Sequence, residues 1–455
     1  MAMGIALDPP SAVLVDTGRA LLPLLVLCCM GGYGAARWLL PERWIRHEVV
    51  LIPWLGWALL ALALYAMNTA LPVSVALWLV VALVLPLAVV RLRDPARRGV
   101  MVGWEHAGAL AGALAVLVLA LAPHVRQGSL AILVPNLDEE YYATLSEFLR
   151  LRPAWPWFDH APANGIAEIV RLPVTRALGW VYLYTVSAAD VLTGLDPYRT
   201  LMPVNYGLYG LSAAGVWLLA RSVLRLGPVA ASGAALLYGT NGFLLWITGY
   251  GFGPNAAALA ALPYAVLAVQ TALRAPRQQH VALAGISLSA LALSHAPLVA
   301  IPLALGLAGA GGVAALTGRD AGQVLKGLLW TGGYAALTGL LGHAAVLEFL
   351  LRTRLQGFMT PSPPEFADAA LAVGLGLRPF GFQRDEELLA RIGYLGALAR
   401  WLEGLLPWPA LLVVPMLAAG AWLSWRRAPA VTGFAAGLLA AAGFAHYVQG
   451  HPYAY

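Results

Sequence analysis

Residues 72–98 read PVSVALWLVVALVLPLAVVRLRDPARR, which is nineteen uncharged, mostly apolar residues followed by four arginines. A helix needs about 20 apolar residues to cross the hydrocarbon of a bilayer. Arginines that flank such a run are typical of a cytoplasmic loop. The same pattern recurs along most of the chain and predicts an all-α polytopic membrane protein.

Composition supports a membrane protein. Of the 455 residues, 60% are hydrophobic and 11% are charged, whereas a soluble domain carries about 25% charged residues. The net charge of +6 comes from short arginine clusters between apolar runs, so we expect membrane lipid and no nucleic acid as a partner. The adjacent Cys28 and Cys29 lie in the first apolar run and are interpreted as packing residues.

The apolar runs predict about twelve transmembrane helices. They cover residues 18–36, 49–66, 72–90, 102–122, 202–220, 229–248, 255–273, 281–294, 298–317, 327–349, 408–425 and 430–448.

The distribution of Lys and Arg predicts the orientation. The loops after the first, third, fifth, seventh, ninth and eleventh spans all carry these residues and fall on one side. The short loops 67–71, 249–254 and 295–297, on the other side, carry none. We therefore expect a cytoplasmic arginine-rich side, with both termini outside.

This orientation depends on how residues 177–194 are interpreted. If they formed a span, every later loop would be inverted. Trp180, Tyr182, Tyr184 and Asp190 favour an interfacial or re-entrant helix instead.

Two long segments, 123–201 and 350–407, then lie outside the cytoplasm and carry much of the remaining charge. Long polar loops of this kind usually carry function. The second contains an amphipathic stretch, 383–408, which we expect to lie on the outer surface.

The first of these segments contains PNLDEEYYATLSEFL (135–149), with three consecutive carboxylates at Asp138, Glu139 and Glu140. Like charges raise one another's pKa, and a helix N-terminus offsets that cost. We therefore expect the acids in the first turn of a helix. They form either a plain acidic helix start or a general base, with or without a metal ligand.

These features resemble the GT-C superfamily of membrane glycosyltransferases. DEEYYATLSEFL (138–149) resembles the acidic and aromatic start of that family's first external loop. Residues 236–273 and 282–309 are similar to its paired spans. The likeness covers 102–407.

The resemblance implies a domain organisation. It comprises a three-helix addition (1–101), a GT-C-like module (102–350) that includes the first external loop, a second external loop (351–407) and a two-helix segment (408–455).

The resemblance also implies the chemistry. Such enzymes take a sugar from a polyprenyl phosphate or diphosphate and invert the anomeric carbon, while a carboxylate of the first loop deprotonates the acceptor. Here that base would be Asp138 or Glu139, with Glu140 still open. The acceptor would be a glycan, a protein or a lipid, and a divalent cation (Mg²⁺ or Mn²⁺) is a possible cofactor.

Other residues of the external segments are candidates for substrate binding. Arginine makes two-pronged contacts with phosphate, although each of these could instead anchor to headgroups. His295 could bind phosphate or cap a broken helix. The candidates are Glu140, Tyr141, Asp159, His160, Arg171, Arg176, His295, Arg352, Arg378 and Arg384.

Two polar residues fall inside the fourth span. We expect Glu105 and His106 to extend from its cytoplasmic end toward the headgroups.

Two other function classes compete with an enzyme: a transporter or flippase for a lipid-linked substrate, and a non-catalytic membrane subunit. The Ala-, Leu-, Gly- and Arg-rich composition resembles that of GC-rich bacteria, so the expected location is a bacterial cytoplasmic membrane.

Overall fold

The computed structural model describes most of the first 294 residues and short pieces beyond them. The described ranges are 9–94, 99–130, 137–153, 180–249, 251, 253–294, 306–313, 316–317, 326–327, 329–333, 419–427, 429 and 431–437. Regular structure in these ranges is helical throughout, as predicted.

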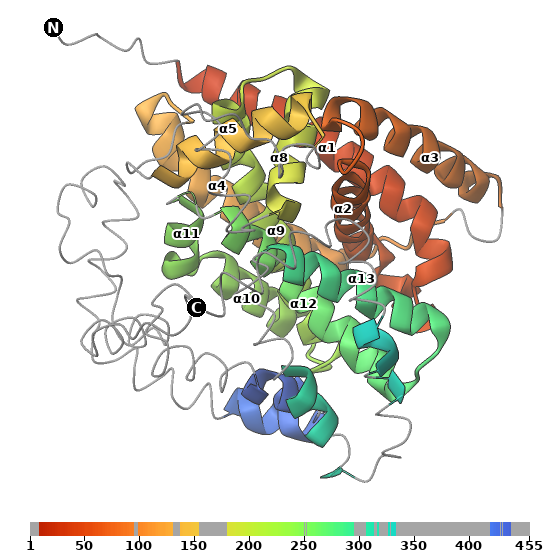
Figure 1. Ribbon diagram of the computed structural model, residues 1–455. Coiled ribbons are helices and arrows are strands. Elements are labelled where there is room, and N and C mark those ends of the chain that lie inside the picture. The colour runs from red at the N-terminus through yellow and green to blue at the C-terminus, as the bar shows by residue number, and fades with distance from the viewer. Residues whose placement is uncertain are drawn as a thin grey trace, which may run out of the picture.

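The helices form one bundle (Figure 1). Their bounds are α1 Pro10–Leu39, η1 Glu42–His47, α2 Glu48–Met67, α3 Val73–Arg93, η2 Trp104–His106, α4 Ala107–Gln127, α5 Leu137–Leu151, α8 Trp180–Thr193, α9 Pro197–Ser222, α10 Pro228–Gly239, α11 Gly242–Gly249, α12 Gly253–Arg274 and α13 Gln278–Ser294.

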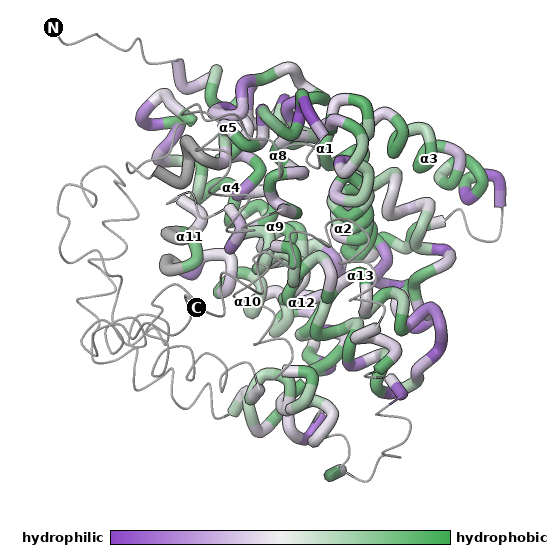
Figure 2. Tube along the Cα trace, in the orientation of Figure 1, coloured by the Kyte–Doolittle hydropathy of each residue, from purple (hydrophilic) through white to green (hydrophobic). Residues whose placement is uncertain are grey.

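Five helical segments of the described residues are long and apolar enough to cross a membrane. They are Pro10–Leu39, Glu42–Met67, Val73–Arg93, Trp104–Gln127 and Gly253–Arg274. They match the first four predicted spans and the seventh. Only 28% of the residues in the apolar stretch of α3 are buried inside the bundle. Figure 2 shows hydrophobic residues along this helix. An outward apolar surface of this kind suits lipid rather than water.

Glycines allow α1 and α2 to cross closely. A Cβ at Gly32 would lie 1.9 Å from the carbonyl oxygen of Ile52, and one at Gly56 would lie 1.7 Å from that of Cys28. Small residues bring helix backbones together in this way in membranes. Both cysteines are free, and Cys28 is buried in this contact.

One predicted span is not a single continuous helix. Residues 229–248 form two helices, α10 and α11, separated by Thr240 and Asn241. The Asn241 side chain accepts a hydrogen bond from the backbone N–H of Leu244 (3.1 Å), which starts the second helix. At 1.5 Å per residue, the 12 residues of α10 extend about 18 Å, less than the hydrocarbon thickness.

The helix predicted at 177–194 exists as α8, but it does not lie on a surface. Every residue from Trp180 to Asp190 is buried. Trp57 Nε1 donates to Thr185 Oγ1 (3.0 Å) and Tyr184 donates to Asn68 Oδ1 (3.1 Å). Its polar groups therefore bond to protein rather than to headgroups, which contradicts the interfacial alternative.

The arginines after the first, third, fifth and seventh spans gather at one end of the bundle, as predicted. We call it the arginine-rich end. Arg91 pairs with Glu48 (2.5 Å), Arg43 donates to Thr271 (2.5 Å) and Arg37 pairs with Asp94 (3.2 Å).

The opposite end is formed by α5, the C-terminus of α8, the start of α9 and the turn between α2 and α3. Asn68 in that turn donates to the backbone oxygens of Leu71 (2.9 Å) and Arg152 (3.2 Å). Figure 1 shows α5 lying across this end of the bundle.

Candidate functional site

The acidic triplet starts a helix, as the sequence predicts. Helix α5 begins at Leu137, which places Asp138, Glu139 and Glu140 in its first turn. The backbone N–H groups of a first turn and the helix dipole stabilise negative charge. The side chains of 137–141, including that of Tyr141, lie outside the described part of the structure.

The remainder of α5 is fixed by packing. Ala143, Leu145 and Leu149 are buried, and the Tyr142 ring meets that of Tyr182 in α8 edge-on at 5.5 Å. The acidic turn is therefore carried on a helix that the bundle holds in place.

A buried carboxyl, Asp190, connects α5, α8 and α9. Ser146 Oγ donates to its Oδ2 (2.8 Å), and the Thr200 hydroxyl donates to its Oδ1. Ser187 Oγ in turn donates to the carbonyl oxygen of Ser146 (2.9 Å).

Burial raises the pKa of Asp190 to about 7, although the hydrogen bonds from Thr200 and Ser146 act in the opposite direction. Ser146 lies eight residues after Asp138, about 12 Å along the helix axis. Asp190 therefore does not belong to the acidic turn. It connects a later part of α5 to α8 and α9. In the sequence, Asp190 stands out as a lone acid in an apolar stretch. The sequence does not indicate that Ser146 and Thr200 bind it.

Most of the other predicted site residues lie outside the described residues. These are Asp159, His160, Arg171, Arg176, His295, Arg352, Arg378 and Arg384. The second external loop, with its amphipathic stretch, does so as well. Their assignment remains a prediction from the sequence.

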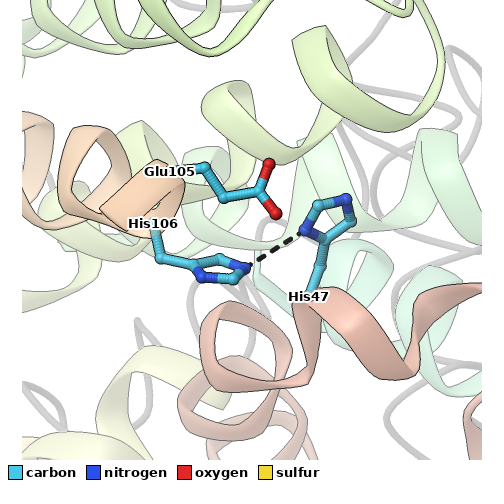
Figure 3. Close-up of side chains that lie close together, drawn as sticks. All are labelled: His47, Glu105 and His106. Carbon is cyan, nitrogen blue, oxygen red and sulfur yellow. Dashed lines mark hydrogen bonds between the residues drawn. The ribbon is translucent and has the colours of Figure 1, made fainter. Parts of the chain in front are cut away.

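A second polar cluster lies at the arginine-rich end. Each of His47, Glu105 and His106 offers a ligand atom, and these atoms lie within 4.8 Å of one another (Figure 3). His47 Nδ1 is 3.3 Å from His106 Nε2. The Trp217 ring packs against both imidazoles, with centroids 5.4 and 5.5 Å away.

This cluster corrects the expected orientation of Glu105 and His106. The His106 side chain is buried rather than extended toward headgroups, and Glu105 pairs with Arg221 (2.5 Å). The polar groups thus find partners within the bundle. Sequence reasoning did not identify His47, because its contact with His106 joins positions 59 residues apart.

The cluster has donors suited to a transition metal, since imidazole and carboxylate bind ions such as Zn²⁺. The separation of 3.3 Å also suits two ligands of one tetrahedral ion. A single proton shared between the imidazoles explains that distance equally well, and the guanidinium of Arg221 already neutralises Glu105. We therefore describe the cluster as a polar link between the starts of α2 and α4 and the end of α9.

No protein-family model, curated protein or solved structure matches this chain.

Proposed function

We propose that this chain is a membrane glycosyltransferase that moves a sugar from a polyprenyl phosphate or diphosphate donor to an acceptor hydroxyl. One observation carries the proposal: three consecutive acids occupy the first turn of a helix packed across the bundle end opposite the arginine-rich end. The positive-inside rule then puts these acids on the non-cytoplasmic face.

The chemistry requires little of the protein beyond a base and charge stabilisation. Asp138 or Glu139 takes the proton of the acceptor hydroxyl as its oxygen bonds to the anomeric carbon from the side opposite the leaving group. The bond from that carbon to the phosphate oxygen breaks, and its electron pair leaves with the lipid phosphate. The configuration at the anomeric carbon is thereby inverted.

The departing phosphate needs positive charge beside it. Arg171, Arg176, Arg352, Arg378 and Arg384 of the external segments are the sequence candidates for that role. A bound Mg²⁺ or Mn²⁺ would supply the same stabilisation.

The test compares wild type with Asp138→Asn and Glu139→Gln in lipid nanodiscs, using a panel of polyprenyl-linked sugars and an envelope extract as acceptor. Released polyprenyl phosphate is measured. The variant that lacks the base should lose about 10²- to 10⁴-fold in turnover. Glu147→Gln, on the same helix and paired with Arg150, is the matched control and should keep its rate. Wild type that consumes no donor in the panel, or loss in the control alone, would contradict the proposal.

A second candidate function is transport of a lipid-linked substrate. The interrupted pair α10 and α11 and the short buried α8 favour it, because transporters build substrate sites from discontinuous helices. Movement of a labelled lipid-linked sugar across a vesicle bilayer, without release of its phosphate, would distinguish this function from glycosyl transfer.

A further inference from the structure

Arginines from three parts of the chain line one pocket of about 410 Å³ at the arginine-rich end. They come from η1, from the end of α9 with the turn that follows it, and from the end of α12. These arginines are Arg43, Arg46, Arg221, Arg225 and Arg274.

The charge of the pocket is one-sided. Among the described residues that line it none is acidic, and Glu105 neutralises Arg221 from beside it. Guanidinium groups remain charged at any physiological pH. The arginines that line the pocket therefore repel one another when no anion lies between them. An anion would relieve that repulsion.

Two further donors of the pocket lack a partner within the described structure. Gln270 is 4% exposed and its Nε2 makes no hydrogen bond, and neither does the buried Oγ of Ser222. A buried donor without an acceptor is costly. Donors of this kind beside several guanidiniums complement an oxyanion with several acceptor oxygens.

The backbone at Arg225 is strained. Its φ is 53°, and it is the one non-glycine residue with a positive φ in the described part of the chain. Such a conformation persists where the surroundings determine it and is frequent at ligand sites. The carbonyl oxygen of Arg225 also accepts a hydrogen bond from Arg427 (3.3 Å), which joins this turn to a later segment.

Arginines near a membrane commonly lie separately on loops and attract headgroups. Here they converge with Gln270 and Ser222 on one volume, and that volume lies within the range of small-molecule sites. Arginine forks match phosphate oxygens in geometry as well as charge.

We propose that this pocket binds a phosphate or diphosphate group, carried either by a lipid or by a soluble molecule. The site lies at the bundle end opposite the acidic turn and does not depend on the proposed sugar transfer. Its arginines hold the phosphate oxygens, and Gln270 and Ser222 donate to the same group.

The experiment uses the full chain in neutral phosphatidylcholine nanodiscs. Binding of inorganic diphosphate is measured by calorimetry, and binding of phosphatidic acid and polyprenyl phosphate by native mass spectrometry. Wild type should bind at least one of these probes saturably. Arg46→Gln and Arg274→Gln should each weaken binding about tenfold, the effect of losing one charge-assisted contact.

Arg93→Gln is the matched control, because Arg93 is exposed near the same end and does not line the pocket. Its affinity should equal that of wild type. Binding of diphosphate indicates a soluble ligand, and binding of lipid phosphates alone indicates a headgroup. Absence of saturable binding to every probe, or equal weakening in Arg93→Gln, would overturn the proposal.

A second readout separates ligand binding from folding. Without a probe, Arg46→Gln should melt at or above the wild-type temperature, because like charges have been removed. Addition of the probe should raise the melting temperature of the wild type more than that of the variant. Because donor consumption at the acidic turn is assayed separately, failure of the phosphate site leaves the glycosyltransferase test intact.

Discussion

At the residue scale, a few buried polar groups account for how α5 and α8 are held. Asp190 is fully buried, yet its carboxyl receives hydroxyl donors from α5 and α9. It is therefore satisfied by hydrogen bonds while remaining costly to ionise. The sequence shows an acid in an apolar stretch, but its hydrogen bond to Ser146, 44 residues away in the chain, is set by tertiary packing.

Asp190 makes stability depend on pH. Its pKa in the folded protein is raised to about 7 from the usual 3.8, so the folded state binds more protons than the unfolded state between these values. The free energy of unfolding should therefore fall as pH rises from about 4 to about 7, by about 4 kcal/mol at most, and level off above.

Asp190→Asn preserves the shape without a charge and should flatten that profile. Thermal unfolding from pH 5 to 8 in nanodiscs measures it, with the exposed Asp196→Asn as control. The explanation fails if the stability of Asp190→Asn falls with rising pH as steeply as that of the wild type.

At the element scale, the sequence predicted some helices well and others poorly. Uncharged apolar runs predicted α1 to α4 and α12, because length and hydropathy suffice for a spanning helix. The break between α10 and α11 was missed, because Thr240 and Asn241 are only two polar residues in a long apolar run. The burial of α8 was missed because aromatic residues occur both at membrane interfaces and in protein cores.

Asn68 joins three elements, and its removal should uncouple them. Its amide donates to carbonyl oxygens in the α2–α3 turn and just after the C-terminal end of α5, and its oxygen accepts from Tyr184 of α8. Asn68→Leu leaves the buried hydroxyl of Tyr184 without its acceptor and removes the donor to the part-buried carbonyl oxygens of Leu71 and Arg152. It should lower the unfolding free energy by about 2–3 kcal/mol. Tyr184→Phe, which removes one bond, should cost about 1 kcal/mol. Thermal unfolding checks both, and a smaller effect for Asn68→Leu than for Tyr184→Phe would contradict the assignment.

The close crossing of α1 and α2 predicts opposite effects for two Gly→Ala substitutions. Gly32→Ala forces a methyl group against the carbonyl oxygen of Ile52 and should destabilise by about 3 kcal/mol. Gly233→Ala in α10 meets no atom within 4 Å and should be neutral or stabilise by up to about 1 kcal/mol. Equal unfolding temperatures for the two variants would show that the close crossing is absent.

At the scale of the whole molecule, the two ends of the bundle carry different polar groups. Arginine loops far apart in the sequence meet at one end, and helix α5 with its acidic first turn lies across the other. The sequence predicted this division, because the side on which each loop falls follows from counting spans. It could not predict the pocket at the arginine-rich end, since its lining comes from segments more than 200 residues apart.

The most direct test is the sidedness of sugar transfer. Sealed proteoliposomes are sorted into the two orientations by impermeant labelling of Asp196→Cys near α5 or Gly227→Cys at the arginine-rich end, both exposed. Donor lies in both leaflets, a water-soluble acceptor is added outside, and released polyprenyl phosphate is measured. We expect transfer in vesicles that expose α5 and none in vesicles that expose the arginine-rich end. Transfer confined to the latter, or none in either, would contradict the account.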